Sequence, residues 1–305
     1  MSDVLVFSAY GGPEVLHVVD LDPGTPGPQQ IRVRVHAAGI QPFDCLFRSG
    51  AARQWVPATF PQRIGNELAG VVEAVGAEVT TVAVGDHVLG WAMLAGAAAH
   101  VIVAADQVVA RPAGMPWLEA GALSASGQTA STALDRLGVR AGETLLIHAA
   151  AGGVGSFAVQ LARALGAHVI GTASERNHDY LRSLGATPVR YGDGLIDRIR
   201  AAAPHGVDAA LIGVGADEAV RTSRELVARP QRIGTLGFHP LAAQLGIARI
   251  STERSIARLT ALVTQYTEGS LKVEIERAYP LAEAAAAHHR METGHVRGKL
   301  VFQVS

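Results

Sequence analysis

Small residues crowd into one short stretch of the chain, directly after an apolar segment. Residues 144–147 read Thr-Leu-Leu-Ile, and after His148 come three alanines and then Gly-Gly-Val-Gly at 152–155. A glycine turn between a strand and a helix lets the backbone approach a pyrophosphate, and the free N–H groups that open the helix can bind its oxygens. The spacing A-x-G-x-x-G therefore predicts a dinucleotide-binding turn formed by Ala151, Gly152, Gly153, Val154 and Gly155. The alternative is a tightly packed turn that binds nothing.

The end of the next apolar segment bears on which dinucleotide fits. An NAD site has an acidic residue there, about 20 residues after the glycines, to accept from the ribose 2′-hydroxyl. Here Ala173 stands in that place, and Ser174 and Arg176 follow it. A hydroxyl and a guanidinium could bind a 2′-phosphate, so the pattern favours NADP(H), unless Arg176 is simply a solvated residue at a helix start. Glu175 would repel that phosphate if its side chain turned inward.

Strand and helix patterns alternate in the part of the chain that carries this turn. Apolar runs are typical of strands at 144–147, 168–171, 208–212 and 232–236, and helical patterns separate them at 155–165, 176–184 and 218–226. Such alternation indicates a parallel sheet covered by helices. We therefore predict the α/β class, with a doubly wound Rossmann sheet as the dinucleotide-binding domain at 121–250.

The first third of the chain has a different texture, which indicates a β-rich domain. Residues 31–35 alternate apolar with basic side chains, and glycines bound short apolar runs at 69–75 and 87–89. Near the other end, a helix is expected at 251–268 and short strands at 272–276 and 298–304. We assign 1–120 together with 251–305 to this second domain.

The composition is that of an ordinary globular protein. The 305 residues are 49% apolar and 17% charged, with a net charge of −1, which excludes a charge bias toward nucleic acid or a membrane surface. The longest charge-poor stretch, 92–110, is interrupted by polar residues, so no membrane span is expected. A single cysteine, Cys45, rules out an internal disulfide and indicates a reducing compartment, and we predict a cytoplasmic protein.

Several segments together resemble the medium-chain dehydrogenase/reductase family, in its zinc-free quinone oxidoreductase (zeta-crystallin-like) branch. They read AAGIQPFDCLFRSG at 37–50, PQRIGNELAGVVEAVGAEVTTVAVGDHVLG at 61–90, HAAAGGVG at 148–155, GVDAALIGVG at 206–215 and GKLVFQV at 298–304. The resemblance covers essentially the whole chain. It implies a GroES-like catalytic domain beside the Rossmann domain, NADPH-dependent reduction of quinones or α,β-unsaturated carbonyl compounds, and a homodimer. The sheet edges that would pair in that dimer are expected near 232–238.

The resemblance also predicts that this chain binds no metal. Zinc relatives carry a cysteine ligand in the segment occupied by 41–43, a His-Glu pair where this chain has Asn66 and Glu67, and a four-cysteine lobe between 90 and 111. Zinc prefers three or four thiolate or imidazole ligands, and such ligands are missing at both places. Cys45 is expected to be a small buried side chain.

Site residues carry over from the family position by position. Gln41 stands where relatives usually have an Asn that faces the nicotinamide and the substrate; it keeps the amide donor, and we assign it the catalytic position. Leu46 replaces an aromatic hydroxyl and cannot donate a proton, while Asp44 and Arg48 are expected to be structural. The remaining cofactor contacts implied by the resemblance are Thr129, Tyr191, Gly213, Val214, Gly237, Phe238 and Lys299.

Two other functions stay open at this point. The lost hydroxyl at Leu46 would allow an NADP(H)-binding protein with little catalysis, a structural or regulatory relative. Alcohol oxidation with NADP is the other, and it would need a metal as Lewis acid.

Overall fold

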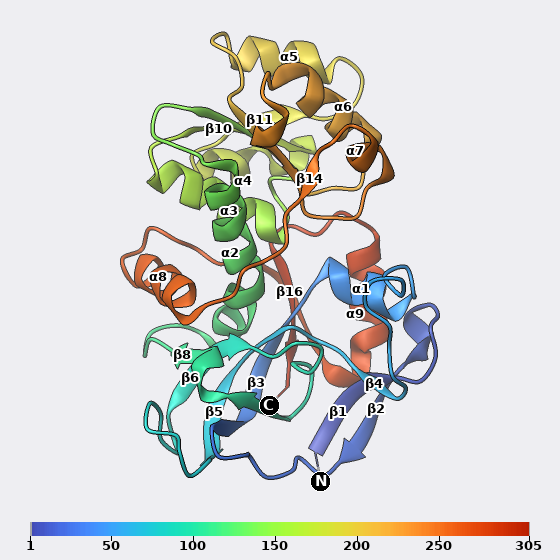
Figure 1. Cartoon of the computed structure of the whole chain (residues 1–305), viewed down its shortest axis with the longest axis vertical. Helices are drawn as coiled ribbons and strands as arrows, with labels where there is room; N and C mark the ends of the chain where they lie inside the picture. The colour runs from blue at the N-terminus through green and yellow to red at the C-terminus, as the bar shows by residue number, and fades with distance from the viewer. Residues whose placement is uncertain (1, 305) are drawn as a thin grey trace. The chain divides into compact units, whose positions relative to one another are not determined.

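The computed structural model describes residues 2–304 and divides into two compact units (Figure 1). The first unit consists of Met1–Ala125, Ser255–Thr264 and Val273–Ser305, and the second of Ser126–Arg254 and Gln265–Lys272. Each unit is built around its own sheet.

The second unit contains a six-stranded sheet in the order β11-β10-β9-β12-β13-β14, in which every neighbouring pair is parallel. Strands β10 and β11 lie to one side of β9, and β12, β13 and β14 lie to the other, which is the strand order of the dinucleotide-binding fold. The strands are β9 (Thr144–His148), β10 (His168–Ala173), β11 (Thr187–Arg190), β12 (Ala209–Ile212), β13 (Ile233–Thr235) and β14 (Ala248–Arg249). The predicted parallel sheet is confirmed.

Helices connect these strands, as the alternation of patterns predicted. The central strand β9 buries Leu145, Leu146 and Ile147 completely, because a parallel sheet is covered on both faces. The connecting helices are α3 (Gly153–Ala164), α4 (His178–Ser183), α5 (Leu195–Ala202), α6 (Asp217–Leu226) and α7 (Pro240–Gln244), and α2 (Trp117–Leu137) precedes β9. The helix expected at 176–184 begins with a 3-10 turn at Glu175–Asn177, so its α-helical part is shorter than predicted.

One expectation about this sheet is wrong. The strand near 232–238 was expected to lie at a sheet edge, but β13 pairs with β12 on one side and with β14 on the other. Strand β14, with both of its residues exposed, is the last strand on that side. Two residues are too few to show a periodic pattern, which is why the sequence did not predict this strand.

The first unit contains a seven-stranded sheet in the order β15-β16-β3-β5-β6-β8, with β7 also paired to β3. Pairs are antiparallel except β15 with β16. Its strands are β3 (Gln30–Ile40), β5 (Glu67–Val75), β6 (His87–Trp91), β7 (His100–Ala104), β8 (Val108–Ala110), β15 (Ile275–Pro280) and β16 (Lys299–Gln303). Alternate residues of β3 from Ile31 to Val35 are fully buried, which confirms the half-buried strand predicted there.

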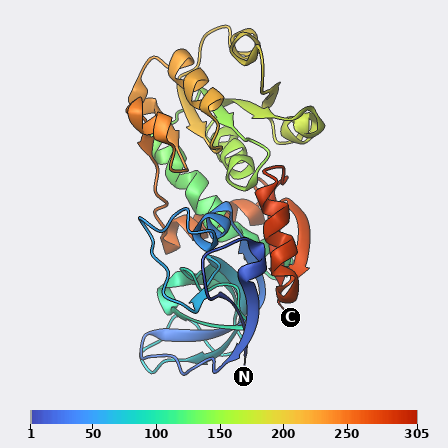
Figure 2. The same ribbon diagram turned by 90° about the vertical axis from the view of Figure 1, so that its right-hand side faces the viewer.

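A smaller sheet and three helices complete this unit. The sheet has the order β2-β1-β4, formed by β1 (Ser2–Phe7), β2 (Leu16–Leu21) and β4 (Gln62–Arg63). The helices are α1 (Pro42–Arg48), α9 (Ala284–Glu292) and α8 (Ile256–Thr267), of which the last three residues belong to the second unit. Helix α9 packs beside β15, β16 and α1, as Figure 2 shows in red. Helix α8 corresponds to the helix expected at 251–268, and it begins five residues later than predicted.

Candidate active site

The turn between β9 and α3 distinguishes two kinds of glycine. A Cβ on Gly155 would lie 2.3 Å from the carbonyl oxygen of Ala149 and 2.7 Å from the Cα of Ala150, so the close packing of helix on strand requires glycine there. A Cβ on Gly152 would lie 3.4 Å from the same oxygen, an ordinary contact. Gly152 has extended backbone angles and precedes the first residue of α3. The protein's own packing therefore does not demand glycine at 152, and its missing side chain leaves room at the helix N-terminus.

The start of a helix is a general binding place for anions. The first turn of a helix has N–H groups without acceptors inside the helix, and the positive end of the helix dipole lies there. The N–H of Gly152 itself donates to the Ala149 oxygen (3.1 Å), and Ala149 holds a left-handed backbone with φ of 57°. The turn is thus closed by a hydrogen bond of its own backbone.

Most predicted cofactor residues of the second unit lie just after the carboxyl ends of its strands. Because the strands are parallel, their carboxyl ends meet at the same edge. Ser174 follows β10, Tyr191 follows β11, Gly213 and Val214 follow β12, and Gly237 and Phe238 lie just beyond β13. Thr129 lies on α2, where its hydroxyl is 2.7 Å from that of Thr252.

The corner formed by the ends of β10 and β11 carries one residue that the sequence reasoning missed. Ala173 is paired in register with Arg190, so Arg190 ends its strand beside Ser174. The guanidinium of Arg190 lies 3.6 Å from the Glu175 carboxylate, and both side chains are exposed, as is Arg176. Glu175 therefore pairs with Arg190. Arg190 can be found only from the register of the neighbouring strands β10 and β11, which one sequence alone does not show.

The first unit brings Gln41 into a buried polar cluster. Gln41 lies between the end of β3 and the start of α1, and its side-chain Nε2 donates to Oε1 of Glu67 (2.5 Å). Lys299 donates to the same carboxylate oxygen (2.8 Å), and Ala125 N–H donates to Oε2 (2.6 Å). Glu67 is 0% and Lys299 2% exposed. Sequence reasoning missed Glu67 as a partner of Gln41, and it did not foresee Lys299 as a buried ion-pair partner.

Asp44 supports Gln41 from the other side. Its Oδ2 accepts from the backbone N–H of Gln41 (2.8 Å), and its Oδ1 accepts from the side chain of Asn66 (2.8 Å). Burial raises the pKa of Asp44 to about 7, although the Gln41 N–H, Lys299 and Asn66 act against that rise. The structural role expected for Asp44 agrees with these contacts.

The other residues of α1 pack toward α9. Arg48 is fully buried, donates to the Gly11 carbonyl oxygen (2.7 Å) and forms an ion pair with Glu292. The Cys45 thiol lies 3.5 Å from Nδ1 of His288, and burial raises its pKa to about 12. Cys45 is therefore a neutral buried thiol, while Leu46 on the same helix is 43% exposed.

The comparisons with known proteins agree with this geometry. Residues 27–133 match the alcohol dehydrogenase GroES-like domain, and residues 184–302 match the zinc-binding dehydrogenase family. The chain is 35% identical to a quinone oxidoreductase of Pseudomonas aeruginosa over 99% of both chains. The chain belongs to the quinone oxidoreductase branch of the medium-chain dehydrogenase/reductase superfamily.

Solved structures of this superfamily are similar over the full length. The quinone oxidoreductase of Escherichia coli, in complex with NADPH, has a TM-score of 0.87 at 27% identity, with 99% of each chain covered. The CurK enoyl reductase has a TM-score of 0.88 at 26% identity, with 100% of this chain and 99% of that chain covered. The two units are thus a GroES-like domain and a Rossmann domain of this family, and its members include enzymes that are named for quinone or enoyl reduction.

The family includes zinc-binding members, so the donor set at the two ligand positions matters. In this chain the segments 41–43 and 66–67, which correspond to the ligand positions of the zinc relatives, do come together. They contribute the Gln41 amide, the Asn66 amide and a Glu67 carboxylate that is already paired with Lys299. Among residues 2–304, no three or more His, Cys, Asp or Glu side chains are grouped so that they could hold a metal ion. No helix within the same range combines the length and the apolar character needed to cross a bilayer.

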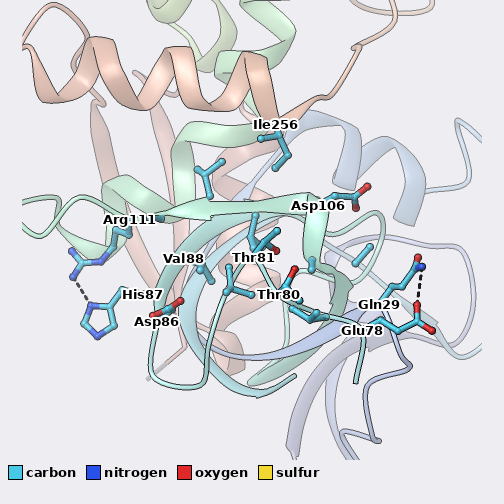
Figure 3. Close-up of a pocket in the computed structure, with 17 residues that line it drawn as sticks. Gln29, Glu78, Thr80, Thr81, Asp86, His87, Val88, Asp106, Arg111 and Ile256 are labelled. Atoms are coloured by element: carbon cyan, nitrogen blue, oxygen red, sulfur yellow. Dashed lines mark hydrogen bonds between the residues drawn. The ribbon is translucent and has the colours of Figure 1, made fainter. Parts of the chain in front are cut away.

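A hollow elsewhere in the GroES-like unit contains none of the predicted site residues. It has a volume of about 720 Å³ and lies between the β5–β6 connection and β8. Figure 3 shows Gln29 bonded to Glu78 at one end and Arg111 beside His87 at the other. These side chains are thus engaged in hydrogen bonds within the GroES-like unit, and the hollow is not part of the predicted site.

Buried titratable groups predict how stability changes with acid. Burial lowers the pKa of His148 to about 4 and that of His288 to about 3, so below pH 6.5 the unfolded chain binds two protons that the native protein does not. Asp44 acts in the opposite sense, because the native protein keeps its proton up to about pH 7. The net difference between pH 6 and 5 is one proton, so the free energy of unfolding should fall by about 1.4 kcal/mol per pH unit on acidification.

Urea unfolding at pH 6.0, 5.5 and 5.0 measures this slope. Replacing His148 by Asn should remove one bound proton and flatten the slope, while replacing the exposed His205 by Asn should leave it unchanged. An unchanged slope in the His148→Asn variant would contradict a neutral His148.

Proposed function

We propose that the chain is an NADPH-dependent reductase of quinones or α,β-unsaturated carbonyl compounds that works without a metal. The observation that carries this proposal is the turn at 149–155, where Gly155 is demanded by packing and Gly152 is not. A space at a helix N-terminus, in a sheet of this strand order, is suited to a dinucleotide pyrophosphate. We further propose the GroES-like unit as the substrate domain and the Rossmann unit as the cofactor domain.

The β10–β11 corner supports NADPH over NADH. Ala173 leaves out the carboxylate that a ribose 2′-hydroxyl would need. Ser174, Arg176 and Arg190 offer a hydroxyl and two guanidinium groups at the ends of adjacent strands. Glu175, the acid that would oppose a phosphate, lies 3.6 Å from the Arg190 guanidinium, which partly offsets its charge.

This corner leads to a prediction about cofactor choice. Arg176→Ala and Arg190→Ala should each raise the Kd of NADPH about tenfold, which is about 1.4 kcal/mol, and change the Kd of NADH by less than a factor of two. Fluorescence titration with both dinucleotides measures the effect. Arg182→Ala, which removes an exposed arginine paired with Asp179 on α4, is the matched control. An equal loss for NADPH and NADH would show that neither arginine recognises the phosphate.

The residues of this chain would bind and orient the reactants. A nicotinamide held at the carboxyl edge of the sheet would supply the hydride. Gln41 would hydrogen-bond to the substrate or to the nicotinamide, and Leu46 offers no proton donor, so the proton that completes reduction would come from solvent. The donor set at 41, 66 and 67 supports a reaction without zinc, because two amides and an already neutralised carboxylate are poor zinc ligands.

Oxidation of NADPH with a panel of quinones, 2-alkenals and enones tests this function. Turnover above background with at least one class, lost in a Gly152→Asp variant, is the expected result. If saturating NADPH gives no turnover with any of them but still raises the melting temperature, the chain is an NADP(H)-binding protein with little catalysis. The absence of a hydroxyl at Leu46 is the observation that favours this second function.

Two further expectations remain proposals. We propose a homodimer, with β14 as the sheet edge available on the side of the Rossmann unit where the sequence placed the pairing. We also propose a cytoplasmic location, on the single cysteine and the balanced charge.

A further inference from the structure

One carboxylate in the GroES-like unit organises the surroundings of Gln41. Glu67 accepts three hydrogen bonds: its Oε1 from Gln41 Nε2 (2.5 Å) and Lys299 Nζ (2.8 Å), and its Oε2 from Ala125 N–H (2.6 Å). The carboxylate has no exposed surface. A buried charge persists only when it is paired and hydrogen-bonded, and both conditions hold here.

The local backbone is shaped to admit this carboxylate. A Cβ on Gly39 would lie 2.0 Å from Oε1 of Glu67 and 2.8 Å from the carbonyl oxygen of Gly121. Gly39 stands two residues before Gln41 in the chain. Any other residue at this position would therefore displace the Glu67 carboxylate. A glycine inside a strand commonly marks a close approach, and here the approaching group is the Glu67 side chain.

The ion pair decides which way the Gln41 amide faces. An ionised carboxylate only accepts hydrogen bonds, so the NH₂ group of Gln41, and not its carbonyl oxygen, must face Glu67. Lys299 is 2% exposed, and its ammonium lies 2.8 Å from the same carboxylate oxygen that the Gln41 amide contacts. One of the two amide hydrogens of Gln41 is thus bonded to Glu67. The Gln41 side chain was expected simply to donate to a ligand, but this hydrogen is already used within the protein.

We propose that Glu67 is a positioning residue for Gln41, and that Lys299 serves the site by pairing with the Glu67 carboxylate and holding it in place. Two consecutive residues then hold Gln41 from two sides. Asn66 donates to Asp44, which accepts from the backbone N–H of Gln41. Glu67 accepts from the side-chain amide of Gln41. The catalytic consequence rests on the proposed function, because it requires Gln41 to meet the substrate or the nicotinamide. The orientation itself does not.

A double-mutant cycle separates this role from a merely structural ion pair. The neutral pair Glu67→Gln with Lys299→Met leaves no unpaired buried charge but no longer forces the amide to face inward. The kcat/KM of the neutral pair is compared with that of the natural Glu67–Lys299 pair twice, once with Gln41 present and once in a Gln41→Ala background. We expect kcat/KM to fall at least tenfold with Gln41 present and by less than a factor of two in the Gln41→Ala background. Equal losses in both backgrounds would overturn the proposal.

A second readout does not depend on activity. In the ¹⁵N-labelled wild type, the Gln41 side-chain amide, assigned by its loss in Gln41→Ala, should exchange slowly with solvent because it is bonded to a buried carboxylate. The neutral pair should speed this exchange at least tenfold. If that variant fails to fold, Glu67→Asp keeps the charge for Lys299 and shortens the reach to Gln41, and it should show the same acceleration. Unchanged exchange overturns the positioning role, whereas accelerated exchange in a protein without turnover would count against the proposed function alone.

Discussion

Replacing Gly152 by aspartate is expected to abolish NADPH binding while the protein stays folded. A Cβ at this position meets the Ala149 oxygen at an ordinary 3.4 Å, and the extended backbone there suits any residue, so the change should cost little stability. The new carboxylate would occupy the space at the N-terminus of α3 and repel the phosphates. We expect the Kd of NADPH to rise at least about 100-fold, which is about 2.7 kcal/mol of binding energy.

Gly155 provides the contrasting variant. A methyl group there would lie 2.3 Å from a backbone oxygen, so Gly155→Ala should lower the free energy of unfolding by about 3 kcal/mol. Calorimetric titration and urea unfolding of both variants measure the two effects. If Gly152→Asp bound NADPH like the wild type, the turn would not be the pyrophosphate site; if it unfolded as readily as Gly155→Ala, Gly152 would also be a packing residue.

Removing the Lys299 ammonium should give the largest loss of stability. Lys299→Met leaves the Glu67 carboxylate buried without a cation, and breaking a buried pair from one side costs about 3–5 kcal/mol. Lys299 also acts against the rise in the pKa of Asp44, so its loss should raise that pKa further and favour the uncharged carboxyl group of Asp44.

The paired variant Glu67→Gln with Lys299→Met is the control for this prediction. It should recover most of the lost stability, because replacing both partners leaves no charge to bury. Urea unfolding at pH 7.5 compares the three proteins. A single variant Lys299→Met as stable as the wild type would mean that the ammonium does not pair with Glu67 in solution.

The features that could be predicted from the sequence are local ones. Apolar runs of four or five residues located β9, β10 and β12, and the glycine spacing located the turn before α3, because strand burial and helix packing leave their mark on adjacent residues. The resemblance to a known family added Gln41 and the order of the domains. Each of these depends on neighbours in the chain or on a motif read as a unit.

What could not be predicted depends on contacts between distant segments. Lys299 and Glu67 are 232 residues apart, and no periodicity in either segment signals that they pair. Arg190 becomes a candidate only once the register of β10 and β11 is known. Strand β14, with two exposed residues, carries no hydrophobic pattern, and the sheet edge was misplaced for that reason.

Titration of the wild-type protein with NADPH and with NADH tests the central claim most directly. We predict one NADPH bound per chain, with a Kd at least tenfold lower than that of NADH, through the turn at Gly152 and the guanidinium groups at the β10–β11 corner. No binding of NADPH, or tighter binding of NADH, would contradict it.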